Sequence, residues 1–488
     1  MDAGQMHSND GGPTTQSPRR VAIIGAGITG LAAAQHLTAL DDHVQVTLFD
    51  SADRVGGIIC TESRDGYLME LGPDSFITNK PGGVQLCDDI GFSDQLIPTD
   101  PTYRRSLVLR NGRPLPVPDG FMLMAPARPL AIATTKILSF RGKLRLLSEA
   151  FKAGQPPVDD ESLAAFVRRR FGNEALERLV QPLIGGIYTS DPEKLSLMAT
   201  LPRFAEMERD FGSVIKATLA EQRKKSGRSE EQSGSGARYG LFVTPANGLS
   251  SLIDAIMQHL TACGRVHLRT STTVSHVDSG DGQWHVQTAD REPMSFDAVI
   301  ITLPAHQAAA LLRSDVFSEL AGSLRGIEYA SSAIVVTGHR LEDFHHPLDA
   351  FGLVIPHIEN RRILAVSFTS RKFPGRAPEG RILLRTFVGG AMQPELLQHD
   401  DQELTKLVHE ELRDLLGMQA APEFSQVMRY NDAMPQYHVG HLARVEQIER
   451  LSSQHPGLSL AGNAYRGVGI PDSIASGYTA AEDVYHGW

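Results

Sequence analysis

Apolar positions near the start of the chain follow first a strand pattern and then a helix pattern. Residues 21–24 form a short apolar run that ends at a glycine, as in a buried parallel strand. Apolar residues then recur at helical spacing through Leu31, Ala34 and Leu37, and residues 44–49 form a second strand-like run. The pattern predicts that ordered structure begins at Arg20 with a strand, a helix and a second, parallel strand.

Helical periodicity dominates residues 118–220. Asp160 is expected to cap a helix that ends at Gly172 and buries one face, made of Leu163, Phe166, Val167 and Phe171. A second helix is expected over residues 173–181, ending before Pro182, because proline has no N–H to donate. These residues are therefore predicted to form a separate helical unit.

Strand patterns return after residue 266. Strands are expected at 272–277, 284–288 and 297–303. Two other segments are polar and rich in glycine and serine, which predicts a disordered tail over residues 1–19 and a flexible loop over residues 221–239. The chain thus divides into ordered blocks separated by recognisable linkers.

Composition narrows the class of protein. The chain has 488 residues, of which 41% are hydrophobic, and its formal net charge is −10. That length favours two or three packed units, and the acidic balance argues against a nucleic-acid-binding protein. The three cysteines are far apart and no metal signature such as HExxH occurs, so neither a disulfide framework nor a metal site is predicted. With no long apolar run or signal peptide, a cytoplasmic protein is expected.

A nucleotide-binding fingerprint follows the first strand: Gly25, Ala26, Gly27, Ile28, Thr29 and Gly30 form a GxGxxG motif. Its glycines allow a tight turn, close approach of a pyrophosphate, and close packing of helix on strand. Asp50, at the end of the second strand, can accept hydrogen bonds from ribose hydroxyls. The motif continues with Arg54, Gly56 and Gly57, and this D-x-x-x-R-x-G-G continuation resembles FAD-dependent oxidoreductases rather than NAD dehydrogenases.

Further segments resemble the same superfamily of flavoenzymes. Residues 70–75 resemble its segment near the flavin, residues 297–304 its strand that returns to the FAD domain, and residues 460–473 its C-terminal flavin-contacting motif. The resemblance implies non-covalent FAD, since no cysteine lies beyond Cys263 to form a thioether. Besides the fingerprint, the cofactor-binding residues that it implies are Gly72, Pro73, Asp74, Ser75, Val274, Gly462, Asn463, Gly467, Val468, Gly469 and Ile470.

Three segments point to one family within this superfamily. Residues 186–196 (GIYTSDPEKLS), residues 436–442 (QYHVGHL) and residues 462–470 (GNAYRGVGI) resemble motifs of the protoporphyrinogen/coproporphyrinogen oxidase family. The resemblance implies oxidation of a porphyrinogen to the porphyrin in haem biosynthesis, by three two-electron steps. Molecular oxygen would be the acceptor and hydrogen peroxide the by-product. Because the cofactor carries this chemistry, no catalytic side chain is predicted.

The resemblance also implies where the substrate binds. Arg105 first, and Arg104 second, resemble the family's arginine that pairs with a propionate, and Gly186 would let the macrocycle approach the backbone. Lys80 is a further candidate cation for additional propionates. The choice between protoporphyrinogen IX and coproporphyrinogen III stays open, with a slight preference for the former.

The resemblance implies an α/β fold, α+β overall, with a Rossmann-like FAD-binding domain of the glutathione-reductase/amine-oxidase type. That domain is expected to be discontinuous, over residues 20–90, 240–310 and 430–488. A mixed-sheet substrate domain is expected over residues 91–117 and 311–429, with the helical unit inserted. The resemblance and the apolar stretch 121–138 together indicate that the helical unit contacts the inner face of the cytoplasmic membrane peripherally. The sequence leaves open whether the protein forms a homodimer and whether it passes its product directly to the next enzyme of the haem pathway.

Two enzymatic alternatives and one non-enzymatic alternative compete with this interpretation. A flavin amine oxidase would usually carry a lysine near the flavin, in the strand around residues 329–338, but residues 321–344 contain none. A phytoene-type desaturase would share the N-terminal motifs but not residues 186–196. A non-catalytic flavin- or tetrapyrrole-binding protein would not need flavin motifs at both ends of the chain.

Overall fold

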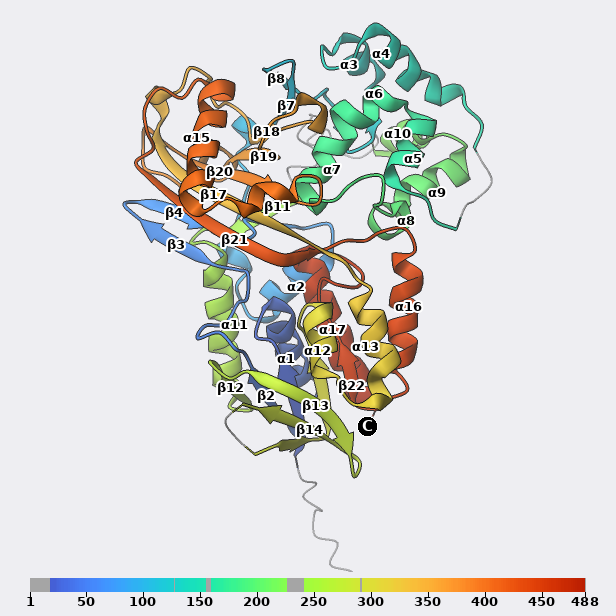
Figure 1. Ribbon diagram of the computed structural model, residues 1–488, viewed down its shortest axis with the longest axis vertical. Helices are drawn as coiled ribbons and strands as arrows, with labels where there is room; N and C mark the ends of the chain where they lie inside the picture. The colour runs from blue at the N-terminus through green and yellow to red at the C-terminus, as the bar shows by residue number, and fades with distance from the viewer. Residues whose placement is uncertain (1–17, 127, 155–158, 226–240, 290–291, 488) are drawn as a thin grey trace, which may run out of the picture.

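The computed structural model describes residues 18–126, 128–154, 159–225, 241–289 and 292–487. In Figure 1 a parallel sheet with its helices forms the lower half of the molecule, and a larger sheet and a group of helices lie side by side above it. The predicted disordered tail falls almost entirely outside the described residues. The predicted loop 221–239 overlaps the described helix α10 at its first five residues, and its remainder lies outside the described part of the chain.

The lower half is built on a five-stranded parallel sheet in the order β12-β2-β1-β16-β22. Its strands are β1 (Arg19–Ile24), β2 (Val44–Phe49), β12 (Val266–Arg269), β16 (Ala298–Ile301) and β22 (Leu458–Leu460). All four neighbouring pairs run parallel, so the carboxyl ends of all five strands lie at one edge. Segments from both ends of the chain thus share one sheet, and the predicted α/β class is confirmed.

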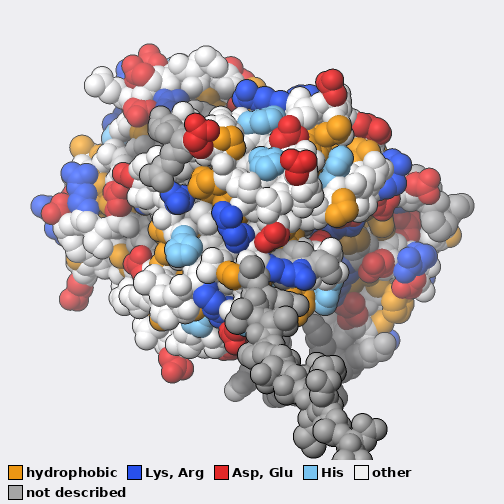
Figure 2. All heavy atoms as spheres, turned by 90° about the horizontal axis from the view of Figure 1, so that it is seen from below, with side chains coloured by type: hydrophobic (Ala, Val, Ile, Leu, Met, Phe, Trp, Pro, Cys, Tyr) orange, Lys and Arg blue, Asp and Glu red, His pale blue; other side chains and the backbone are white. Residues whose placement is uncertain are grey.

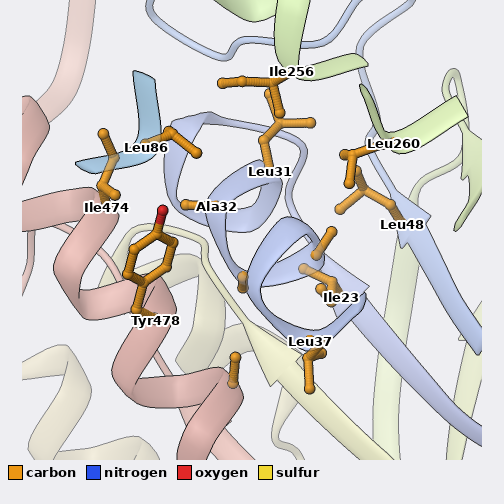
Figure 3. Packing of buried hydrophobic residues seen from close by; sticks show 14 of the residues in the cluster. Ile23, Leu31, Ala32, Leu37, Leu48, Leu86, Ile256, Leu260, Ile474 and Tyr478 are labelled. Atoms are coloured by element: carbon orange, nitrogen blue, oxygen red, sulfur yellow. The ribbon is translucent and has the colours of Figure 1, made fainter. Parts of the chain in front are cut away.

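Four helices pack around one apolar cluster on this sheet: α1 (Ile28–Leu40), α2 (Pro81–Asp89), α11 (Leu249–Cys263) and α17 (Ile470–His486). Figure 3 shows Leu31 and Ala32 of α1 between Ile256 of α11 and Tyr478 of α17. Side chains of this size each stabilise the fold by about 1.5–3 kcal/mol when fully buried. The cluster therefore fixes the last helix of the chain against the first.

The opposite side of the parallel sheet is covered by a second cluster. A three-stranded antiparallel sheet, β13 (Val274–Gly280), β14 (Gln283–Thr288) and β15 (Met294–Phe296), meets the helices α12 (Ala305–Leu311), α13 (Ser318–Arg325) and α16 (His441–Ser452) there. The predicted strands at 272–277, 284–288 and 297–303 correspond to β13, β14 and β16. Figure 2 views the molecule from this lower end, where basic and acidic side chains are interspersed.

The upper half contains a seven-stranded mixed sheet in the order β21-β17-β20-β19-β18-β7-β8. Its strands are β7 (Ser106–Arg110), β8 (Arg113–Pro116), β17 (Tyr329–Arg340), β18 (Gly352–Val354), β19 (Ala365–Phe368), β20 (Arg381–Gly389) and β21 (Phe424–Pro435), with α14 (Thr369–Lys372) after β19. Helix α15 (Asp401–Leu416) packs on one face. Because β21 continues to Pro435, this sheet includes residues that the sequence assigned to the FAD-binding segment 430–488.

Short strands join the two halves. They are the hairpin β3 (Thr61–Arg64) and β4 (Tyr67–Glu70), and a small sheet of β5 (Phe76–Ile77), β11 (Phe242–Pro245) and β6 (Leu96–Pro98). Beside the large sheet lies the helical unit (Figure 1). Its elements are β9 (Phe121–Met122), β10 (Ala125–Pro126), α3 (Pro129–Thr134), α4 (Phe140–Leu147), α5 (Leu163–Arg170), α6 (Asn173–Ala175), α7 (Gln181–Tyr188), α8 (Leu197–Thr200), α9 (Pro202–Phe211) and α10 (Val214–Lys225).

Two predictions about the helical unit are wrong. The cap of α5 is Ser162, whose hydroxyl accepts from Ala165 N–H at 3.1 Å. Asp160 instead accepts from the Ser196 hydroxyl (2.8 Å) and from Gly440 N–H (3.0 Å), so it ties the helical unit to the chain before α16. The second helix does not stop before Pro182.

The chain stays helical across Pro182 because a π-helical turn precedes it. Residues Leu176–Val180 form this turn, and Pro182 then occupies the first turn of α7. A proline is tolerated there, because first-turn residues need no intrahelical N–H donation. No helix among the described residues is long and apolar enough to cross a membrane.

The close approach of α17 to α1 gives a stability prediction. A Cβ on Gly477 of α17 would overlap the carbonyl oxygen of Thr29 in α1. Gly477→Ala is therefore expected to lower the free energy of unfolding by about 1–3 kcal/mol through overpacking. Gly322→Ala in α13, where a Cβ meets nothing within 4 Å, is the matched control and should be neutral or slightly stabilising. Urea unfolding of both variants measures this, and equal stabilities would contradict it.

Candidate active site

Two glycines of the fingerprint are closely packed against neighbouring atoms, and the third faces open space. Gly25 has a φ of +107°, and a Cβ on Gly30 would overlap the carbonyl oxygen of Gly25. These two glycines are therefore required by the turn and by the packing of α1 on β1. A Cβ on Gly27 would meet nothing within 4 Å, and no described side chain caps α1 at this residue. The N–H groups of the first turn are thus available to an anion such as a pyrophosphate.

Asp50 is held against the fingerprint by the backbone. Its carboxylate accepts from Ala26 N–H at 2.7 Å and from Ala52 N–H at 2.8 Å, one bond to each oxygen. A carboxylate oxygen has two acceptor positions, so each keeps one for a ribose hydroxyl. Asp50 therefore orders the loop and can still take the predicted role.

The Arg54–Gly57 continuation forms a second loop beside the first. Gly56 N–H donates to Ala26 O at 2.8 Å. The Arg54 guanidinium donates to the carbonyl oxygens of Gly57 (2.7 Å) and Ile59 (3.0 Å). The Arg54 side chain thus fixes the shape of this loop by binding the loop's own carbonyl oxygens. The role of Arg54 in cofactor binding, which the resemblance implies, stays a prediction.

The segment before Val274 lies at the same edge of the sheet. Ser271 N–H donates to Ala52 O at 2.7 Å, and Thr272 N–H donates to Asp50 O at 2.8 Å. Val274 itself begins β13, is buried, and packs in the cluster that contains Phe49. The backbone of Val274 is near the nucleotide loop, by which we mean the glycine fingerprint with Asp50. The side chain of Val274 belongs to the core.

The C-terminal glycine motif precedes the N-terminus of α17 and is held by the chain before α16. The Tyr437 hydroxyl donates to Asn463 O at 2.6 Å and accepts from Gly467 N–H at 2.8 Å. Burial raises the pKa of Tyr437, so this hydroxyl keeps the proton that it donates. His441, stacked on Tyr437 at 4.0 Å, contacts Tyr465 O at 2.8 Å. Sequence reasoning used residues 436–442 only as a family marker and missed this supporting role.

Val468, Gly469 and Ile470 complete the approach to α17. Val468 packs against the core of the helical unit, and Gly469 is the N-cap of α17. Lys80 forms a two-pronged ion pair with Asp472 in the first turn of α17, at 2.6 and 2.8 Å. Lys80 is therefore already paired at this helix terminus.

Residues Gly72–Ser75 are held by Lys372 of α14 and Arg385 of β20. The Asp74 carboxylate is 2.8 Å from Lys372 Nζ and 3.3 Å from an Arg385 nitrogen, and Arg385 also donates to Gly72 O. Ser75 donates to Asp74 at 2.7 Å. Burial alone would raise the pKa of Asp74, but the charges of Lys372 and Arg385 hold it well below its usual range. Sequence reasoning missed both cations, because neither lies in a motif.

The predicted substrate residues each have contacts of their own, and their role stays a prediction. Arg105 pairs with Asp349, whose backbone oxygen also accepts from Arg105 Nε at 2.8 Å. Arg104 donates to Thr99 Oγ1 (3.1 Å) and to Thr99 O (3.0 Å). Gly186 is exposed on α7, with Val354 of β18 4.0 Å from where a Cβ would stand. Among the described residues, no hydrogen bond or ion pair joins Gly186 to either arginine.

Comparisons with known proteins agree with this geometry. The model of the family described as flavin containing amine oxidoreductase matches residues 28–485. A coproporphyrinogen III oxidase of Staphylococcus aureus is 36% identical over 96% of this chain and 99% of its own length. A mitochondrial protoporphyrinogen oxidase of Nicotiana tabacum is 29% identical over 96% and 94%. A solved candidate protoporphyrinogen oxidase of Exiguobacterium has a TM-score of 0.84 at 28% identity, covering 96% of this chain and 99% of its own.

These matches extend over nearly the whole chain. They confirm the predicted resemblance to porphyrinogen oxidases and make a non-catalytic protein a poor description. The chain belongs to the flavin containing amine oxidoreductase family, and it is a flavin-dependent oxidoreductase.

Proposed function

We propose that this chain oxidises coproporphyrinogen III to coproporphyrin III in haem biosynthesis, with non-covalent FAD as cofactor. The observation that carries the proposal is the similarity to the S. aureus coproporphyrinogen III oxidase, which extends over 96% of this chain. The mitochondrial and chloroplastic protoporphyrinogen oxidases of N. tabacum are less similar, at 29% and 31% identity. The sequence slightly favoured protoporphyrinogen through Arg104 and Arg105, and their contacts with Thr99 and Asp349 do not decide between the two substrates.

The residues of the site fit FAD. The uncapped N-terminus of α1, open over Gly27, would take the pyrophosphate, and Asp50 would take a ribose. The backbone of residues 462–470 would adjoin the flavin, with the N-terminus of α17 directed at it. Cys87 is an unsuitable point of covalent attachment, because burial raises the pKa of its thiol to about 12.

Bound FAD supplies the two-electron transfer, and the chain positions the substrate and excludes side reactions. Over three cycles the porphyrinogen loses six electrons and six protons, and three molecules of oxygen become three of hydrogen peroxide. The seven-stranded sheet and the helical unit, with exposed Gly186, would enclose the macrocycle. In this proposal the FAD-binding domain resumes after Pro435, where β21 ends, instead of at residue 430.

The helical unit carries a surface that suits an anionic membrane. Leu130, Phe140, Leu144 and Phe151 are exposed, Phe151 at 90%. Residues 128–152 contain six lysines or arginines and one acidic residue, Glu149, in a chain whose net charge is −10. Apolar side chains next to basic ones favour binding at a lipid surface that carries negative charge. We therefore retain the proposal of a cytoplasmic enzyme with peripheral membrane contact.

Turnover tests the proposed function. Each porphyrinogen, protoporphyrinogen IX or coproporphyrinogen III, is mixed anaerobically with the FAD-loaded protein, and air is admitted. Porphyrin fluorescence is expected to rise faster than the autoxidation blank, with kcat/KM at least about tenfold higher for coproporphyrinogen III, a difference of about 1.4 kcal/mol in transition-state binding. Bound FAD with no acceleration for either substrate would refute the proposal. Preference for protoporphyrinogen would refute only the choice of substrate.

Tyr437 links the C-terminal loop to cofactor binding. Tyr437→Phe removes the bonds to Asn463 O and Gly467 N–H, at a cost of about 1–3 kcal/mol, and is expected to weaken FAD binding about tenfold or more. The control is Tyr67→Phe, which removes a bond from a buried tyrosine to Glu423 away from this loop. FAD titration by flavin fluorescence measures both. Equal FAD affinities in the two variants would show that the loop does not depend on Tyr437.

Membrane contact is tested with vesicles. Phe140→Ser combined with Phe151→Ser is expected to lower the binding of the protein to anionic vesicles at least about tenfold, because burying each ring contributes about 1.5–3 kcal/mol. Val316→Ser, which changes an exposed residue outside the helical unit, is the control. Co-sedimentation with phosphatidylglycerol and with phosphatidylcholine vesicles gives the readout. Wild-type protein that sediments with neither would end this proposal.

A further inference from the structure

We infer that Lys372 binds a propionate carboxylate of the substrate, exchanging its partner Asp74 for that carboxylate when the porphyrinogen enters. The inference rests on the proposed function and deepens it, because it names a substrate-binding residue outside every motif in the sequence. It is independent of Arg104 and Arg105.

Lys372 reaches the flavin-proximal segment from the large sheet. It is the last residue of α14, and its Nζ lies 2.8 Å from Asp74 Oδ1 and 2.9 Å from Ser75 Oγ. The aliphatic stem and ammonium lie near two rings, with Nζ 5.3 Å from the centre of Phe242 and 5.2 Å from that of Phe373. Aromatic faces stabilise a cation without neutralising it.

The charges around Asp74 do not balance. The cations that act on this group are Lys372, Arg385 and Arg376, and the carboxylates are Asp74 and Glu70. Three cations against two carboxylates leave one positive charge in excess. An unbalanced charge away from water is costly, so the group favours one more anion.

Only one of these cations is free to move. Arg376 is fully buried and donates to the carbonyl oxygens of Ala246 (2.7 Å) and Pro245 (2.8 Å). The Arg385 side chain is 3% exposed and is held by Gly72 O as well as by Asp74. Lys372 is 16% exposed and has a flexible four-carbon stem. It is therefore the cation that can turn toward an incoming carboxylate.

Arg385 keeps the Asp74 carboxylate paired during the exchange. When Lys372 leaves, the carboxylate keeps the Arg385 charge at 3.3 Å and the Ser75 hydroxyl at 2.7 Å. No buried carboxylate is then left unpaired, which would otherwise oppose the movement. The added carboxylate also removes the excess positive charge of the group.

A cofactor phosphate is the other anion that could satisfy this excess. The FAD pyrophosphate, however, already has the uncapped N-terminus of α1 at Gly27. Lys372 comes instead from α14, the helix that follows β19 in the proposed substrate domain. The geometry therefore favours a substrate carboxylate, and the experiment separates the two anions.

The test uses FAD-loaded full-length enzyme with Lys372→Met, which removes the charge and keeps the length of the side chain. KM for coproporphyrinogen III is expected to rise at least about tenfold with kcat changed less than about threefold, since ground-state binding is lost. Lys372→Arg should restore most of the affinity, and the FAD dissociation constant should stay within about twofold of wild type. Lys406→Met, on the exposed side of α15, is the control and should match wild type.

A binding measurement separates this inference from the proposed function. Wild-type enzyme should bind coproporphyrin III more tightly than its tetramethyl ester, which has no carboxylates, and Lys372→Met should reduce that difference at least about tenfold. If no porphyrinogen is oxidised but this difference holds, the proposed function fails and the inference stands. Unchanged KM and porphyrin binding in Lys372→Met would overturn the inference. A loss of FAD affinity without a change in KM would also overturn it, by assigning the anion to the cofactor.

Discussion

The packing of the last helix on the first is the contact on which the rest of the site depends. Helix α17 lies against α1 so closely that Gly477 leaves no room for a side chain beside Thr29. This contact joins two regions more than four hundred residues apart in the chain. It sets the N-terminus of α17, and the glycine motif before it, beside the nucleotide loop that precedes α1. The N-terminus of α1 is uncapped, whereas that of α17 holds the Asp472 carboxylate, which accepts from Gly469 N–H at 3.3 Å.

A second constraint connects this site to the large sheet. Asp74 accepts bonds from Lys372 and lies 3.3 Å from Arg385, while Tyr430 of β21 donates to Leu71 O at 2.7 Å. The segment near the flavin is thus held from the side where the substrate would lie. The helical unit is tied in separately, through Asp160 and Gly440.

The sequence predicted the parts of the structure whose signals are contiguous. Gly25 to Gly30, Asp50 and the strands of the parallel sheet are recognisable because a turn, a helix terminus and an apolar run each have a local signature. Pro182 was misread because a π-helical turn upstream changes which N–H groups are needed. Lys372 and Asp74 are 298 residues apart, and Arg105 and Asp349 are 244 apart. No local pattern reports such pairs, so the sequence alone could predict neither of them.

In the proposed function, both ends of the chain build one flavin site that takes electrons from a porphyrinogen. Anaerobic single-turnover reduction tests it most directly, by following the visible absorbance of enzyme-bound FAD after coproporphyrinogen III is added. One FAD per chain is expected to bleach as coproporphyrinogen III loses its first two electrons, and its absorbance should return when oxygen is admitted. Bound FAD that keeps its absorbance in the presence of coproporphyrinogen III would contradict the account.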